Sequence, residues 1–141
     1  MITEDYVSFE VAKLLKEKGF NIPVYHSIRK VYKDERPDTS IWRSDRPENY
    51  NDIEEGNNHY CSYSCPTLQM AMKWLREEHN VYIDICTLSQ LSYCYRVCLV
   101  SDTTGTLYED YACEEGERFY SYREACDFAL EYCLENILEE E

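Results

Sequence analysis

The first apolar and polar positions of the chain follow a helical period. Apolar residues recur every three or four positions between residues 8 and 18, at Val11, Ala12, Leu14 and Leu15. Ser8 suits the cap before the first turn, and Gly19 suits the left-handed residue that follows the last turn. The pattern therefore predicts an amphipathic helix over residues 8–18.

The next segment changes from a helical to an alternating pattern and then loses its periodicity. Residues 24–32 are rich in β-branched and aromatic side chains that alternate in polarity, which predicts a strand. From residue 33 to residue 65, prolines and a run of Asp, Asn and Glu interrupt every period, so we predict a long irregular excursion. Trp42 and Tyr50 indicate that part of this excursion packs against the rest of the molecule.

The second half of the chain starts with another amphipathic helix. Ser64 can cap it, Pro66 suits its first turn, and Asn80 suits its end. Its apolar stripe consists of Leu68, Ala71, Met72 and Leu75. Three predicted strands follow, over residues 81–86, 92–100 and 106–112, and the last two are joined by a turn with hairpin chemistry.

The final segment predicts the longest helix, over residues 121–138. Ser121 followed three residues later by Glu124 forms a capping box. The predicted buried stripe consists of Ala125, Phe128, Ala129, Tyr132, Cys133 and Ile137. The element order is typical of an α+β protein, and we predict one domain over residues 1–141. Its mainly antiparallel sheet of about four strands would have three helices packed on one face.

The chain has eight cysteines, for which two interpretations differ in chemistry. Most fall in apolar strand or helix patterns, where a free thiol packs as a small hydrophobic group. The alternative is a metal site or a Cys/His enzyme in the 59–65 loop. There His59, Cys61 and Cys65 could supply three ligands, with Cys113 as the candidate fourth. His26 and His79 are the other candidate partners for a catalytic thiol.

Motifs for nucleotide binding and common hydrolytic chemistry are missing from the sequence. It contains no phosphate-binding glycine loop, zinc-protease motif or nucleophile elbow, and we predict no catalytic residues and no cofactor. No stretch approaches about 18 uninterrupted apolar residues, and the first twenty residues lack the features of a signal peptide. We therefore expect a cytoplasmic protein without membrane association, in a compartment where thiols stay reduced.

The net charge is the most unusual property of the sequence. The chain carries 28 Asp and Glu against 14 Lys and Arg, a formal net charge of −14. Residues 101–141 contain thirteen of these acids and only two arginines. A field of this sign repels phosphates, so direct binding to nucleic acid is disfavoured, whereas a basic protein would be attracted.

Tyrosine is the second unusual feature, with 14 residues, several of them interleaved with acids near the end of the chain. Tyrosine provides rigid contact area and is enriched at protein interfaces. We therefore predict a partner-binding surface made by Tyr108, Glu109, Asp110, Tyr111, Glu114, Glu115 and Glu117. The alternative interpretation is a solvated rim whose charges serve solubility.

Four phrases of the sequence resemble a known group of proteins. They are SFEVAKLLKEKGF, CPTLQMAMKWLRE, LYEDYACEEGERF and YREACDFALEYCLEN. The chain resembles small uncharacterised proteins encoded by anaerobic gut bacteria and by their phages and mobile elements. This resemblance implies a cytoplasmic setting and carries no functional residues with it. Together with the acidic surface, it predicts a small non-enzymatic interaction or accessory protein that engages a basic, nucleic-acid-binding host protein.

Overall fold

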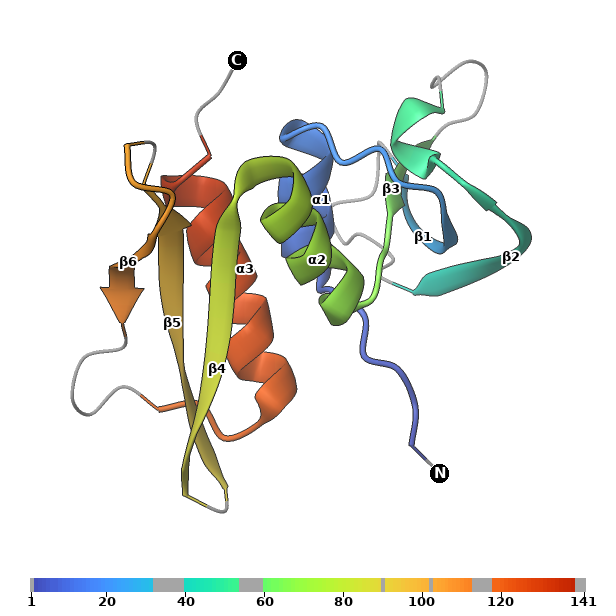
Figure 1. Ribbon diagram of the computed structural model, residues 1–141. Coiled ribbons are helices and arrows are strands. Elements are labelled where there is room, and N and C mark those ends of the chain that lie inside the picture. The colour runs from blue at the N-terminus through green and yellow to red at the C-terminus, as the bar shows by residue number, and fades with distance from the viewer. Residues whose placement is uncertain are drawn as a thin grey trace. The chain divides into compact units, whose positions relative to one another are not determined.

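A computed structural model describes residues 2–31, 40–53, 60–89, 91–101, 103–112 and 118–138. The chain divides into two compact units, residues 1–67 and residues 68–141. Each unit combines helical structure with a three-stranded antiparallel sheet (Figure 1). The predicted α+β class is confirmed, but the single sheet of about four strands under three helices is wrong. The described strands form two sheets, because the first strand pairs with partners from the 33–65 segment instead of with the later strands.

The first unit contains one α-helix and three strands. The order along the chain is α1 (Phe9–Glu17), β1 (Val24–Val31), β2 (Ile41–Glu48), the 3₁₀ turn η1 (Tyr50–Asp52) and β3 (Tyr60–Ser64). The described part of the predicted irregular excursion thus holds two strands. The α1 caps agree with the sequence, since the Val11 N–H donates to the Ser8 side chain and Gly19 has φ +89°. Phe20 then turns back and is buried.

One face of the first sheet meets α1. Ile28 of the central strand β1 lies opposite Tyr63 of β3, and the Tyr63 ring contacts the Phe9 ring of α1 edge to face at 5.3 Å. Ile28 is buried, as are Val11 and Leu15 of α1. These residues are part of the apolar core of the first unit.

The other face of the first sheet is polar. Ser27 lies opposite Trp42 on β2 and Ser64 on β3, while Arg29 lies opposite Ser62. Because successive residues of a strand point to opposite faces, these five side chains share the face that Ile28 does not occupy. The three serines are nevertheless buried. Part of the cover comes from η1, whose Tyr50 N–H donates to the Ser64 hydroxyl at 3.0 Å.

The second unit contains two helices and the second sheet. Its elements are α2 (Leu68–His79), β4 (Val81–Ser89), β5 (Ser92–Val100), β6 (Leu107–Ala112) and α3 (Tyr122–Asn136). The strand order is β4-β5-β6, and Figure 1 shows α3 lying along β4 and β5. The apolar stripe predicted for α2 is confirmed, since all four of its residues are buried. Asn80 leaves the helix with φ 56°, a conformation that Asn tolerates better than most residues.

The buried face of α3 differs from the predicted stripe. Ser121 caps the helix by accepting from the Glu124 N–H, as predicted, but Phe128 is 48% exposed. The buried residues are Ala125, Cys126, Ala129, Leu130, Cys133 and Leu134. The large aromatic side chains lie beside this face, where Phe128 contacts Phe119 and Tyr132 contacts Tyr111 at centroid distances of 5.0 and 4.5 Å. Large aromatic rings can make many contacts at the border of a core. The positions of Phe128 and Tyr132 in the sequence therefore did not show which face of α3 is buried.

Two substitutions can test which face of α3 is buried. Leu130→Ala should lower the free energy of unfolding by roughly 2–5 kcal/mol, because it leaves a cavity beneath a fully buried side chain. Phe128→Ala should cost only about 1 kcal/mol, because half of the ring is already in water. Chemical denaturation of the two variants measures both values. A larger loss for Phe128→Ala would show that the core side of α3 is misassigned.

Candidate functional site

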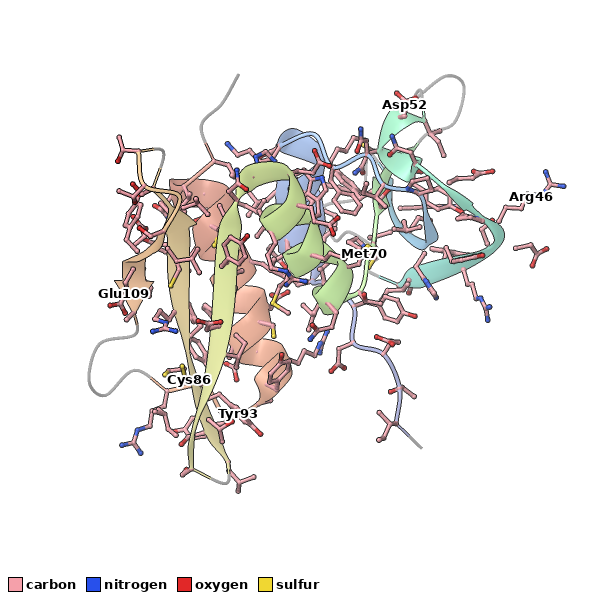
Figure 2. The ribbon with its side chains drawn as sticks, in the orientation of Figure 1. Arg46, Asp52, Met70, Cys86, Tyr93 and Glu109 are labelled. Carbon is pink, nitrogen blue, oxygen red and sulfur yellow. The ribbon has the colours of Figure 1, made fainter. Side chains whose placement is uncertain are left out.

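The predicted acidic surface begins on β6, an edge strand of the second sheet. Its only strand neighbour among the described residues is β5. Tyr108 is 50% exposed and Glu109 is exposed as well. Figure 2 shows the Glu109 side chain extending away from the strand. The remaining acids of the predicted surface, Glu114, Glu115 and Glu117, lie outside the described residues.

Asp110 and Tyr111 of the same strand contact other residues of the second unit, although Asp110 is exposed. The register with β5 shifts so that Tyr111 pairs with Val97 and Glu109 with Cys98, which makes Asp110 the extra residue of a β-bulge. The Tyr132 hydroxyl donates to Asp110 Oδ2 at 3.3 Å. Burial and then the nearby Asp110 carboxylate raise the pKa of Tyr132.

An aromatic cluster holds Tyr111 in place. Its ring stacks on Tyr95 at a centroid distance of 5.3 Å and lies 4.5 Å from Tyr132. Tyr95 is buried and also contacts Phe119. Of the predicted contact residues on β6, Tyr108 and Glu109 therefore offer their side chains most freely to a partner.

The alternative metal site is only partly within the described residues. His59 and Cys113 lie outside them. The Lys16 ammonium group donates to Cys61 Sγ at 3.2 Å, and the buried Cys65 thiol donates to the Val7 carbonyl at 3.6 Å. No group of three or more potential metal ligands occurs in the part of the chain that the structure describes. Cys61 and Cys65 thus have structural contacts of their own.

The two described histidines also pack against aromatic rings. The His26 ring lies 4.4 Å from the Tyr6 ring, and the His79 ring lies 4.7 Å from the Trp74 ring. Burial and then the nearby Arg43 lower the pKa of His26. Cys65 is next to His26 in the sheet, since its backbone N–H donates to the His26 carbonyl at 2.9 Å. The Cys65 side chain is fully buried, which separates it from any substrate in solution.

The remaining described cysteines fall into buried and half-buried groups. Cys98, Cys126 and Cys133 are buried, in agreement with the prediction that these thiols pack as small hydrophobic groups. Cys86 and Cys94 are half-buried and lie directly opposite each other on β4 and β5. Desolvation and then Asp110 raise the pKa of the Cys133 thiol to about 12.

Sequence reasoning missed a polar pocket in the first unit. It has a volume of about 180 Å³ and is lined by Ser27, Arg29, Trp42, Arg43, Ser44, Glu48, Tyr50, Ile53 and Ser62. These residues come from three strands and the segment around η1, so only the strand register brings them together. The alternation of Ser27 and Arg29 with His26 and Ile28 was the available signal for a polar sheet face.

Comparisons of the chain with protein-family models, curated proteins and solved structures gave no match. The resemblance drawn from the four sequence phrases stays a prediction. Among the described residues, no helix is both long and apolar enough to cross a membrane.

The raised Cys133 pKa predicts a dependence of stability on alkaline pH. The folded state favours the protonated thiol, so this stabilisation is complete below a pH of about 9 and is lost as pH rises toward about 12. In Cys133→Ala, the fall of the unfolding free energy above pH 9 should be shallower by up to about 1.4 kcal/mol per pH unit. Denaturant titrations across this range measure the slope.

Leu134→Ala is the matched control, because it also removes buried volume from α3 but no thiol. It should lower the overall stability while keeping the wild-type slope. An unchanged slope in Cys133→Ala would contradict the assigned pKa.

Proposed function

We propose that this protein is a small non-enzymatic interaction protein that binds a basic protein partner through its acidic, tyrosine-bearing surface. The proposal rests chiefly on one observation, that edge strand β6 exposes both Tyr108 and Glu109, one on each face of the strand. The aromatic ring provides contact area and the carboxylate provides charge complementarity. Glu114, Glu115 and Glu117 follow the strand in sequence and add three negative charges to this part of the chain.

The partner is expected to contact side chains and not to add a strand to the sheet. The bulge at Asp110 interrupts the regular register of β6, and two consecutive acids follow Tyr108. Bulges and charges on an edge strand are the devices that protect sheets against indiscriminate strand pairing. A basic segment of the partner would therefore dock along the free edge of β6, from where it can reach both Tyr108 and Glu109.

The charge distribution supports a partner that normally binds phosphates. Acidic residues exceed basic residues by eleven over residues 101–141, and fields of this kind accelerate the approach of an oppositely charged protein. A row of carboxylates can occupy the cationic groove of a nucleic-acid-binding protein. This role fits an accessory protein of a phage or mobile element, as the sequence resemblance implies.

The test uses a variant that removes the surface charges but keeps the internal contact of Asp110. In this variant Glu109, Glu114, Glu115 and Glu117 are replaced by Gln. Proteins captured from a host extract by the wild-type chain are identified by mass spectrometry, and the association rate is measured with the purified partner. We expect the variant to associate at least about tenfold more slowly at low salt, with a weaker dependence on salt.

Glu135→Gln is the control for a charge lost elsewhere in the same unit, since Glu135 is exposed on α3. Tyr108→Ser tests the contact area and should increase the dissociation rate while leaving the salt dependence intact. If the charge variant captures the same basic protein with the wild-type rate and salt profile, the acidic surface is a solvated rim and the proposal is wrong.

A further inference from the structure

Two cysteines face each other across the second sheet. Cys86 of β4 lies directly opposite Cys94 of β5 in the antiparallel register. The Cα atoms of such a pair are about 4.5 or 5.5 Å apart, depending on whether the two residues exchange backbone hydrogen bonds. Both distances fall within the range of about 4.4–6.8 Å between the Cα atoms of disulfide-bonded cysteines. The register therefore brings two thiols within reach of a covalent bond.

This cysteine pair lies on the face of the sheet that α3 does not cover. The neighbouring residue Tyr95 points toward α3, because its ring contacts the Tyr132 ring at a centroid distance of 6.4 Å. Side chains alternate along a strand, so Cys86 and Cys94 point to the opposite face. Both are half-buried, and neither is in a disulfide. A small molecule in solution can therefore reach the two thiols.

The strand pairing around the two thiols is regular and is supported on the same face. Seven consecutive residue pairs join β4 and β5, from Val81 to Thr87 on β4. One step along the face from the cysteines, Arg96 Nη2 donates to Asp84 Oδ2 at 2.6 Å. The alignment of the two cysteines thus follows from the ladder and this ion pair, and needs no contact between the thiols themselves.

The geometry also indicates that a bond between these cysteines would be easy to reduce. The Cβ atoms of a directly opposite pair are about 4.5–5.5 Å apart, but those of a disulfide are about 3.8 Å apart. Closing the bond must draw the strands together, and such strain makes a disulfide more reducible. The register shifts just after Cys86, between Thr87 and Ser89, where an irregularity lets β4 bend. These features favour a reversible bond over a permanent one.

We propose that Cys86 and Cys94 are a redox-sensitive pair, which a small disulfide such as oxidised glutathione converts reversibly to an intrachain disulfide. The thiolate of one cysteine attacks a sulfur of oxidised glutathione, which forms a mixed disulfide and releases one glutathione thiolate. The opposite thiolate then attacks the cysteine sulfur of the mixed disulfide and releases the second glutathione thiolate. The cysteines lose two electrons and two protons, and the two glutathione molecules gain them. This site is independent of the acidic surface on β6.

The experiment treats the folded, full chain with oxidised glutathione. The chain is then unfolded in acid, its remaining thiols are blocked with N-ethylmaleimide, and it is digested with trypsin. Residues 77–96 form one tryptic peptide, in which Cys86 and Cys94 are the only cysteines. Mass spectrometry should find this peptide lighter by two hydrogen atoms and without the blocking group, so two of the eight thiols are lost. An excess of reduced glutathione should restore both thiols.

A comparison with Cys61 measures the advantage of the pair. Cys61 is also half-buried, but Lys30 and not a cysteine lies opposite it. In a buffer with excess reduced glutathione, half-oxidation of the pair should need at least about tenfold less oxidised glutathione than half-formation of a mixed disulfide at Cys61. The reason is that the fold holds the second thiol of the pair beside the first, at a high effective concentration.

Two variants test the roles of the individual cysteines. In Cys86→Ser the second step is impossible, so a glutathione adduct should remain on Cys94 and no hydrogen atoms should be lost from the peptide. Cys98→Ala is the matched control, because Cys98 lies on the same face of β5 as Cys94 but opposite Tyr82. It should leave the oxidation of peptide 77–96 unchanged.

Three results would overturn the proposal. If the wild-type peptide keeps both thiols, or keeps glutathione in place of an internal bond, the two strands do not allow the disulfide. A bond from this peptide to another cysteine or to a second chain would show that the register does not select the partner. Equal preference for the same bond in the urea-unfolded chain would show that closeness in sequence produces it. If Cys86→Ser does not fold, the wild-type peptide alone decides the question.

Discussion

Antiparallel pairing with helices against one face is the constraint on which both candidate surfaces depend. A sheet in this arrangement has an inner face that must be apolar and an outer face that can be polar. In the first unit the outer face becomes the pocket, because Ser27 and Arg29 alternate with the core residue Ile28. Among the described residues of the second unit, β6 is an edge strand of the sheet and exposes Tyr108 and Glu109. Side-chain alternation and strand order thus decide which residues are offered to partners.

The sequence predicted the elements that carry their own local signals. Ser8 and Ser121 cap helices as expected, and Asn80 ends α2, because capping depends on residues within one turn. The strands β5 and β6 were also predicted, since a turn and regular alternation join them. The central position of β1 could not be predicted in this way, because the sequences of its partners β2 and β3 do not look like strands. They contain exposed charges and buried serines and lack the alternation of apolar residues by which a strand is recognised.

The two candidate sites differ in the same way, because one is made of residues that are close in sequence and the other of residues that are distant in sequence. The acidic surface could be predicted because its residues are neighbours in sequence, although sequence alone did not show that Asp110 bonds Tyr132. The pocket could not be predicted from the sequence, because Ser27, Trp42 and Ser62 become neighbours only when strands that are distant in sequence pair. Trp42 was the one sequence signal near the pocket, since a large aromatic side chain in a polar segment indicates that the segment packs against other residues.

The two candidate surfaces also differ in the range over which their charges act. Acids exceed bases by eleven over residues 68–141, so attraction at the acidic surface is a long-range effect that salt screens. The described residues of the first unit hold seven basic and seven acidic side chains, and they provide no comparable field. Any recognition at the polar pocket of the first unit therefore has to come from short-range contacts, which salt screens less than it screens attraction at β6.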